Sequence, residues 1–325
     1  MNEKKLALVG ATGVVGRKVL NVLEEKNIPI EEIKLFASEK SEGKYIKFNG
    51  NLYRINELKE NTFDERFDYA IFTAGSKVAE KYAPKAAKNG CIVIDNSSFF
   101  RMNEDVPLII PEVNLGDVWL NNGIIANPNC STIQALVAIA PINKKYKIKR
   151  IVYTTYQAVS GAGKNGIEDL KNGKNVNYKL KKFDKPIYNN CIPQIDIFEN
   201  DLYTKEEHKM INETKKILHD STIKITATTV RVPVYNCHCE SINIEFEDEI
   251  NVNEIEKILK KSEGIQYFDG IKYPINQDAN NQDKVLVGRL RRDYSVSNGI
   301  NIWVVADNIR KGAASNAVQI LEKII

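Results

Sequence analysis

The sequence of 325 residues lacks long apolar runs, internal repeats, low-complexity segments and blocks of charge of one sign. Because no run approaches about 18 apolar residues, no transmembrane helix is expected. Lys and Arg number 46 against 42 Asp and Glu, and the net charge of +4 is spread along the chain. That balance gives no electrostatic signature of a nucleic-acid or membrane partner, so neither is expected.

Cysteine and histidine are scarce as well, with five and three residues. The cysteines are odd in number and scattered, which favours reduced thiols over a disulfide framework. The first residues contain an acid and too short an apolar stretch for a signal peptide. We therefore expect a soluble, cytoplasmic protein, whose length predicts about two domains of ~150 residues each.

The first third of the chain alternates short apolar, β-branched runs with amphipathic helical stretches. Strands are expected at residues 5–9, 33–37, 70–73 and 91–94, and helices at 14–25 and 78–89. Strands that alternate with helices in this way predict an α/β domain with a doubly wound parallel sheet of the Rossmann type.

The pattern changes near residue 129, where longer runs of alternating polarity begin. They occupy residues 150–158, 224–234, 241–246 and 300–306. Such runs predict a second α/β domain with a mixed or antiparallel sheet, one face of which is solvated or covered by a partner. The last stretch, residues 308–325, is expected to form a helix because its apolar residues recur at helical spacing.

A glycine-rich loop lies between the first expected strand and the first expected helix. Glycines permit unusual dihedral angles and close backbone approach, and a helix N-terminus offers free N–H groups to a pyrophosphate. The spacing is GxxGxxG rather than GxGxxG, but the strand–turn–helix context favours dinucleotide binding over a merely tight turn of small residues. The expected cofactor contacts are Gly10, Thr12, Gly13, Val14 and Val15.

The end of the second expected strand bears on the choice of cofactor. An acid at this place normally holds the adenosine ribose of NAD, whereas this chain has Ser38, Lys40 and Ser41. These residues suit a 2′-phosphate and predict NADP. Glu39 argues against that interpretation, and a simple surface cluster of charges is the alternative.

Cys130 is the candidate nucleophile. Asn129 precedes an apolar helical stretch at residues 133–139 and is a suitable N-cap, which places Cys130 in the first turn. A helix N-terminus favours the thiolate over the thiol, as a nucleophilic cysteine requires. Cys91, in an apolar strand, is more simply a small buried hydrophobe.

The run Cys237-His238-Cys239 resembles a metal site at first sight. Neighbouring residues of a strand face opposite sides, however, and no second CxxC or HxxxH motif accompanies the run, so no metal is expected. His238 is instead the candidate acid–base group, because His208 and His219 lie in a charged helical region. The alternative is an ordinary core or surface histidine.

Several motifs follow the glycine-rich loop in a fixed order. They occupy residues 95–102, 111–114, 127–132, 156–163, 206–210, 231–234 and 307–314. Together and in this order they resemble the aspartate-semialdehyde dehydrogenase family over nearly the whole chain. The segments around Cys130 and Gln157 are the most specific of these motifs.

The resemblance implies NADPH-dependent reduction of L-aspartyl-4-phosphate to L-aspartate 4-semialdehyde with release of phosphate. The context would be biosynthesis of lysine through diaminopimelate, and of threonine, methionine and isoleucine. It also implies a homodimer. The implied domains are a dinucleotide-binding domain at residues 1–128, with the C-terminal helix 308–325 packed on it, and a catalytic and dimerisation domain at residues 129–307.

The resemblance also implies roles for individual residues. Cys130 would attack the acyl phosphate to form a thioester, and His238 would withdraw the thiol proton and later assist collapse of the thiohemiacetal. Gln157 would orient the intermediate and contact the substrate. The remaining expected contacts are Arg231 for the α-carboxylate, Glu206 for the α-ammonium, Arg101 and Lys209 for the phosphate, and Ser160, Gly161 and Asn308 for the cofactor.

Two other functions stay open. Another acyl-phosphate reductase, such as N-acetyl-glutamyl-phosphate reductase or a relative of glyceraldehyde-phosphate dehydrogenase, shares the thioester chemistry but lacks a substrate with a free amino group. A sensor that binds NADP without turnover is the second alternative. Lys40, where family members commonly have Arg, supplies charge without a bidentate fork and weakens the expected selectivity for NADP.

Overall fold

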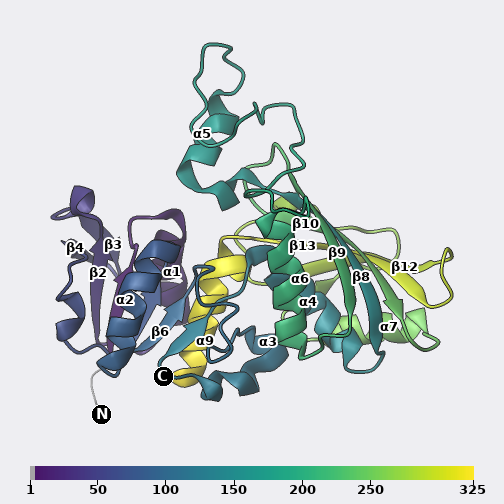
Figure 1. The fold of residues 1–325 in the computed structure, drawn as a ribbon, viewed down its shortest axis with the longest axis horizontal. Helices are drawn as coiled ribbons and strands as arrows, with labels where there is room; N and C mark the ends of the chain where they lie inside the picture. Colours follow the sequence, from purple (N-terminus) through teal and green to yellow (C-terminus); the bar gives the residue numbers. More distant parts are fainter. Residues whose placement is uncertain (1–3) are drawn as a thin grey trace. The chain divides into compact units, whose positions relative to one another are not determined.

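The computed structural model describes residues 4–325, which divide into two units (Figure 1). The first unit extends to Pro128 and is completed by Ala313–Ile325, and the second comprises Asn129–Gly312. Each contains one sheet, mostly parallel in the first and mixed in the second, so the predicted α/β class is confirmed.

The first unit contains a seven-stranded sheet. Its order is β3-β4-β2-β1-β5-β6-β7, and every pair is parallel except β3 with β4. The strands are β1 (Lys5–Val9), β2 (Glu32–Ala37), β3 (Tyr45–Phe48), β4 (Asn51–Glu57), β5 (Tyr69–Phe72), β6 (Ile92–Asp95) and β7 (Ile124–Ala126). The strand order reverses at β1, which places the switch point of a doubly wound sheet at the end of this strand.

The sequence predicts β1, β2, β5 and β6 to within one residue at each end. The hairpin of β3 and β4 was not predicted. Its turn is Asn49-Gly50, and both residues have positive φ angles of 46° and 76°. Such a pair favours a two-residue hairpin turn whose twist matches that of the strands, so the signal was present in the sequence.

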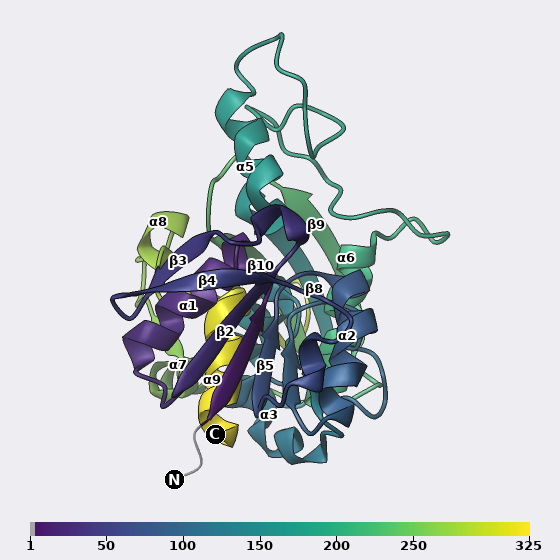
Figure 2. The ribbon, with the colours of Figure 1, turned by 90° about the vertical axis from the view of Figure 1, so that its left-hand side faces the viewer.

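Helices of the first unit pack on this sheet. They are α1 (Val14–Lys26), α2 (Ser76–Lys88) and α9 (Ser315–Ile324), and the short α3 (Pro111–Asn114) contacts α9. Helix α9 contacts α1 and β6, and in Figure 2 its yellow ribbon runs along the sheet. Asn316 holds this helix in place, because its Nδ2 donates to the Ile109 carbonyl at 2.9 Å and to Asn127 Oδ1 at 2.7 Å.

The C-terminal helix is shorter than the predicted 308–325. Asp307 Oδ1 accepts the N–H groups of Ile309 and Arg310 at 2.9 and 3.0 Å, which delays the first helical residue to Arg310. Residues Arg310–Ala314 form a π-helical turn before α9 begins at Ser315. Residues 308–312 accordingly belong to the second unit, and only Ala313–Ile325 belong to the first.

The second unit contains a mixed six-stranded sheet of order β11-β12-β13-β10-β8-β9. Its strands are β8 (Ile148–Gln157), β9 (Lys224–Arg231), β10 (His238–Phe246), β11 (Ile265–Tyr267), β12 (Val285–Asp293) and β13 (Gly299–Ala306). Its helices are α4 (Cys130–Asn143), α5 (Gly163–Asn172), α6 (Lys205–Leu218), α7 (Val252–Lys261) and the short α8 (Asn276–Ala279).

One face of the six-stranded sheet is covered by helices. Helix α4 contacts β10, β12, β13, α6 and α7, and α6 contacts β9. On β10, His238 and Glu240 lie on this helix-covered face, and the alternation of the strand places Cys239 and Ser241 on the opposite face. Residues 131–140 of α4 are all buried, which explains the unbroken apolar run from Ala135 to Ala140. Among residues 4–325, no helix is both long and apolar enough to cross a bilayer.

Candidate active site

Cys130 is the first residue of α4, and the predicted cap is confirmed. Asn129 Oδ1 accepts the N–H groups of Ser131 and Thr132 at 3.0 and 3.2 Å. The thiol therefore stands at the positive end of a capped helix, where the thiolate is favoured. Gly312 lies directly against it, since a Cβ atom on Gly312 would stand 2.8 Å from Cys130 Cβ.

Glu206 connects the start of α4 with the start of α6. Its Oε1 accepts Asn129 Nδ2 at 2.9 Å and Gln157 Nε2 at 3.1 Å, and its Oε2 accepts Lys209 Nζ at 3.2 Å. Burial alone would raise the pKa of Glu206, but the Lys209 charge, the two amides and the Arg231 charge lower it to about 2. The structure thus holds a buried, ionised carboxylate beside the start of α4.

Gln157 and Arg231 end two neighbouring parallel strands, β8 and β9, in direct register. Gln157 Oε1 accepts the Thr155 hydroxyl at 2.9 Å, which turns its Nε2 toward Glu206. Arg231 Nη1 donates to the Ala158 carbonyl at 2.7 Å. Burial lowers the pKa of Arg231, while electrostatic interactions with Glu206 and Cys130 raise it.

His238 begins β10 and is fully buried. Its Nδ1 accepts the main-chain N–H of Ala158 at 3.0 Å. Burial and the Arg231 charge lower the pKa of His238 to about 3, so the imidazole is neutral near pH 7. Gly161 lies over both groups, because a Cβ atom there would stand 3.2 Å from Arg231 Nη1 and 3.4 Å from His238 Nε2.

Ser160 and Asn308 form a second polar group in the same unit. Asn308 Nδ2 donates to Ser160 Oγ at 3.0 Å, and Asn308 Oδ1 accepts the N–H of Cys237 at 3.0 Å. Asp307 supports this group, because its Oδ2 accepts Asn236 Nδ2 at 2.9 Å. The segment between β13 and α9 is thereby tied to the segment that leads into β10.

Of the predicted catalytic and substrate residues, the second unit brings together Cys130, Gln157, Glu206, Lys209, Arg231 and His238. Lys209 joins through Glu206 and also donates to Asp196 Oδ2 at 2.9 Å. Arg101 belongs to the first unit, where its Nη2 donates to the Asn96 carbonyl at 3.0 Å. The predicted cofactor residues other than Ser160, Gly161 and Asn308 also lie in the first unit.

The loop between β1 and α1 has the form that a pyrophosphate requires. Gly10 has a φ of +88°, and a Cβ atom there would stand 2.6 Å from Thr73 Oγ1. A Cβ atom on Gly16 would stand 2.9 Å from Ala11 Cα, so this close helix–strand approach also requires glycine. Gly13 caps α1 without a side-chain acceptor, which leaves the first N–H groups of the helix available to an anion.

Ser38, Lys40 and Ser41 follow β2 directly, next to the switch point at β1. Ser38 and Lys40 are exposed, and the Ser41 N–H donates to the Ser38 carbonyl at 2.8 Å in a single turn. Acidic groups are close as well, since Glu57, Glu42 and Glu39 raise the pKa of Lys59 at the end of the neighbouring β4. Basic and acidic side chains therefore lie together beyond the ends of β2 and β4.

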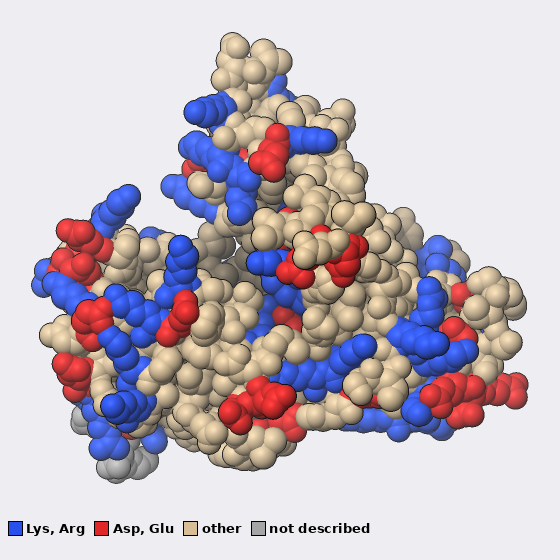
Figure 3. Space-filling model, viewed as in Figure 1, with Lys and Arg blue, Asp and Glu red and all other residues tan. Residues whose placement is uncertain are grey.

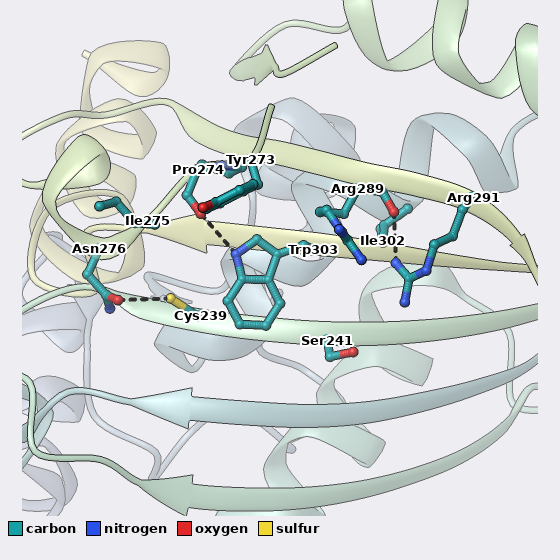
Figure 4. A pocket seen from close by; sticks show the side chains of 10 residues that line it. All are labelled: Cys239, Ser241, Tyr273, Pro274, Ile275, Asn276, Arg289, Arg291, Ile302 and Trp303. Atoms are coloured by element: carbon teal, nitrogen blue, oxygen red, sulfur yellow. Dashed lines mark hydrogen bonds between the residues drawn. The ribbon is translucent and has the colours of Figure 1, made fainter. Parts of the chain in front are cut away.

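A pocket of about 370 Å³ lies on the other face of the six-stranded sheet (Figure 4). Cys239, Ser241 and Trp303 line it, and Trp303 Nε1 donates to the Pro274 carbonyl at 3.0 Å. Because neighbouring residues of β10 face opposite sides, this pocket is separated by the sheet from His238 and Glu240. It does not belong to the polar cluster around Cys130.

Charge on the surface is interspersed in most of the face drawn in Figure 3, and Lys and Arg gather over α5. Part of this positive charge is neutralised locally, since Lys181 Nζ lies 2.6 Å from Glu168 Oε2. Three main-chain N–H groups, those of Lys181, Lys182 and Phe183, donate to Asp169. These contacts order the basic segment that follows α5.

Two family models match the chain. The model described as "Semialdehyde dehydrogenase, NAD binding domain" matches residues 5–119, and "Semialdehyde dehydrogenase, dimerisation domain" matches residues 139–311. With the parallel sheet of the first unit and the polar cluster of the second, they define a semialdehyde dehydrogenase that uses a nicotinamide cofactor.

Individual relatives narrow this class. An aspartate-semialdehyde dehydrogenase of Aquifex aeolicus is 52% identical, over 99% of this chain and 98% of that protein. The crystal structure of aspartate semialdehyde dehydrogenase II complexed with ASA from Vibrio cholerae is 46% identical with a TM-score of 0.96, over 99% of this chain and 98% of that one. A Candida albicans aspartate semialdehyde dehydrogenase solved with NADP is 25% identical with a TM-score of 0.77, over 99% and 98%. The chain belongs to the aspartate-semialdehyde dehydrogenase family, an oxidoreductase family of amino-acid biosynthesis, and the resemblance seen in the sequence motifs is confirmed.

Sequence reasoning missed Glu240, Gly312 and Ala158. Glu240 is fully buried, neither of its carboxyl oxygens has a hydrogen-bond partner within residues 4–325, and burial raises its pKa well above the usual range. Its place two residues after His238 on one strand was the available signal. The position of Gly312 against Cys130 and the use of the Ala158 peptide group have no local signal, because both depend on distant segments.

Proposed function

We propose that the chain catalyses the NADPH-dependent reduction of L-aspartyl-4-phosphate to L-aspartate 4-semialdehyde with release of phosphate. The reaction would serve biosynthesis of lysine through diaminopimelate, and of threonine, methionine and isoleucine. One observation carries the proposal: a buried carboxylate (Glu206), a guanidinium (Arg231) and an imidazole (His238) lie together near the capped start of α4. Cys130 is the first residue of this helix. The complex with ASA in the Vibrio cholerae relative supports the choice of substrate.

Cys130 is the proposed nucleophile. The capped helix start and the nearby Arg231 charge both favour its thiolate, which attacks the acyl phosphate and forms a thioester. A nicotinamide cofactor, when bound, would supply hydride to the acyl carbon, and Ser160, Gly161 and Asn308 would hold its nicotinamide end. Gln157 is proposed to orient the reacting group through its amide without adding charge. His238, whose imidazole is neutral near pH 7, is the proposed acid–base group.

The substrate's amino-acid end fits the two buried charges. The Arg231 guanidinium is the proposed partner of the α-carboxylate, because a planar fork suits that group. Glu206, whose low pKa keeps it ionised, is the proposed partner of the α-ammonium. Arg101 and Lys209 are proposed to neutralise the phosphate, Lys209 from its place beside Glu206.

The glycine-rich loop fits a dinucleotide. Its uncapped helix start and the space that only glycine leaves at Gly10 and Gly16 suit the pyrophosphate, with contacts proposed from Gly10, Thr12, Gly13, Val14 and Val15. Ser38, Lys40 and Ser41 are proposed to hold the 2′-phosphate of NADP, which the NADP-bound Candida albicans relative supports. Ser160, Gly161 and Asn308 are proposed to meet the nicotinamide end.

The domain roles follow from the same interpretation. We assign cofactor binding to the unit that contains β1, and catalysis and dimerisation to the unit that contains Cys130. The match of residues 139–311 to a dimerisation domain supports a homodimer. The cytoplasm is the proposed location, because a biosynthetic reaction that consumes NADPH requires that cofactor pool.

The deciding experiment is the reverse reaction, phosphate-dependent oxidation of aspartate semialdehyde with NADP. We expect turnover by the unaltered protein, near-total loss in Cys130→Ser with NADP binding retained, and full activity in the control Cys191→Ser, which alters an exposed thiol. A preference for N-acetylglutamate semialdehyde would assign the chain to the acetylated substrate. NADP binding without turnover of either aldehyde would identify a sensor.

A further inference from the structure

The main-chain N–H of Asn129 has its hydrogen-bond partner on a distant helix. Asn129 is the N-cap of α4, so its own N–H takes no part in the hydrogen-bond ladder of that helix. Glu213 Oε2, on α6, accepts this N–H at 2.6 Å. Both residues are buried, and a carboxylate that accepts an N–H group in a buried site makes a short, strong hydrogen bond. The backbone is therefore held firmly at the residue before Cys130.

This contact does what a local residue does in an ordinary capping box. There, a Glu or Gln at the third helical position reaches back to the N–H of the N-cap residue. The third position of α4 is Thr132, and in the described part of the chain its Oγ1 has no hydrogen-bond partner. Glu213 supplies the acceptor instead, from 84 residues further along the chain. The tertiary structure thus completes the capping box of the helix that begins with Cys130.

Two carboxylates of α6 hold Asn129, one at its side chain and one at its main chain. Glu206 and Glu213 are separated by two helical turns, so they lie on one face of α6. Glu206 Oε1 accepts Asn129 Nδ2 at 2.9 Å, which turns Asn129 Oδ1 toward the first N–H groups of α4. Glu213 fixes the backbone that carries this capping side chain.

Helix α6 is itself fixed to the sheet of the second unit. The hydroxyl groups of Thr214 and of Tyr153, on β8, form a hydrogen bond of 3.1 Å. Glu207 Oε1 accepts the Thr229 N–H of β9 at 2.9 Å. Because β8 and β9 end at Gln157 and Arg231, the sheet that carries these two site residues also determines where α4 begins.

We propose that Glu213 is a positioning residue for the nucleophile. By accepting the Asn129 N–H, it holds the first turn of α4, and with it the Cys130 sulfur, in place for attack on the substrate. The inference rests on the proposed function for its catalytic meaning. Misplacement of a reacting group by about 1 Å can cost about 100-fold in rate, so a shift of the helix start is expected to lower kcat more than it changes KM.

Two conservative variants separate the reach of the side chain from its charge. Glu213→Gln keeps an oxygen at the same reach and removes the charge, whereas Glu213→Asp keeps the charge and withdraws the oxygen by one methylene. In the reverse assay, we expect the Gln variant to stay within about threefold of the wild-type kcat and the Asp variant to lose about tenfold or more. KM for aspartate semialdehyde should change less than about threefold in both. The reverse order of kcat, or equal kcat in the two variants, would overturn the proposal.

The placement of Cys130 can also be tested without any substrate. Iodoacetamide alkylates the thiolate, and mass spectrometry of the Cys130 peptide distinguishes this thiol from the other cysteines. The start of α4 favours the thiolate only while its first turn is ordered, so alkylation at pH 7 should be slower by about threefold or more in Glu213→Asp than in the wild type. Glu213→Gln should react at least as fast as the wild type, because a negative charge near the thiolate is removed. A wild-type rate in the Asp variant would overturn the proposal whatever aldehyde the enzyme uses.

Asp169→Ala is the control for a general loss of stability. Asp169 is also fully buried and accepts main-chain N–H groups, but these belong to residues 181–183 in the segment after α5. We expect urea unfolding to show a loss of stability in Asp169→Ala while Cys130 is alkylated at the wild-type rate. Equal slowing of alkylation in Asp169→Ala and Glu213→Asp would overturn the proposal, because the slowing would then follow stability and not the contact with Asn129.

Discussion

Gly312 packs so closely against Cys130 that a residue with a Cβ atom does not fit at position 312 without a shift of one of the two segments. The Cβ atom of any substituted residue at 312 would stand 2.8 Å from Cys130 Cβ and 3.3 Å from Cys130 Cα. The Gly312 N–H donates to the Asp307 carbonyl at 3.0 Å, which closes the turn that carries Gly312. The segment after β13 therefore packs directly against Cys130.

Gly312→Ala should lower activity and stability together. The added methyl group must displace the start of α4 or the Asp307 turn, at a cost of about 1–3 kcal/mol in unfolding free energy. Because Cys130 moves with the helix start, we expect kcat to fall more than tenfold, measured in the reverse assay beside urea unfolding. Gly116→Ala is the matched control, since a Cβ atom there meets nothing within 4 Å. Wild-type kcat and stability in Gly312→Ala would show that the segment after β13 can shift to accommodate the methyl group.

Arg231→Lys should weaken substrate binding while the protein stays folded. Lysine keeps a positive charge but cannot donate to the Ala158 carbonyl and grip a carboxylate with a planar fork at the same time. We expect KM for aspartate semialdehyde to rise about tenfold, which corresponds to about 1.4 kcal/mol of binding. Steady-state kinetics measure this directly. An unchanged KM would reject Arg231 as the carboxylate partner.

Glu240→Gln should change how stability depends on pH. The raised pKa of Glu240 means that the folded protein holds it protonated while the unfolded chain ionises it above its usual value of 4.5. Its contribution to stability is complete below pH 4.5 and declines as the pH rises toward the folded-state pKa. Gln is neutral at every pH and nearly the same shape, so the variant should gain stability relative to wild type between pH 5 and pH 8. Urea unfolding at pH 5 and at pH 8 measures the difference in unfolding free energy between the variant and the wild type. The same difference at both pH values would mean that Glu240 is ionised in the folded protein.

Lys40→Ala should reduce the preference for NADP over NAD. Removing the ammonium leaves only two serine hydroxyls for a 2′-phosphate and does not alter the pyrophosphate loop. We expect the ratio of kcat/KM for NADP to that for NAD to fall about tenfold, the loss of one charge-assisted contact. Lys47→Ala, which removes another exposed lysine of the same unit, should leave the ratio unchanged. An equal ratio in the two variants would remove Lys40 from the cofactor site.

The fold was predictable where the periodicity of the sequence was strong. Buried parallel strands such as β1 and β5 are short apolar runs, and α1 shows apolar residues at helical spacing, so both kinds of element can be recognised locally. The start of the C-terminal helix was predicted too early, because the Asp307 carboxylate changes where this helix begins. That contact is a property of the side chain's geometry, which apolar periodicity does not report.

The site was predictable in its residue types but not in its arrangement. Helix α6 appears from its sequence to be a solvated, charged helix, yet Glu206 and Glu213 on it are buried. Glu206 is buried because Asn129 and Gln157, from two other elements, satisfy its carboxylate. The order of the sequence motifs indicated these residues. The hydrogen bonds among them join distant segments of the chain and are visible only in the three-dimensional structure.

His238 and Arg231 are both held by the main chain of Ala158, and not by its side chain. Replacement of Ala158 by another small residue, such as glycine or serine, would leave the N–H and the carbonyl where they are. Proline alone among the standard amino acids lacks the N–H that the imidazole accepts. Glycine, alanine and serine at position 158 would therefore all keep the two main-chain hydrogen bonds to the imidazole and the guanidinium.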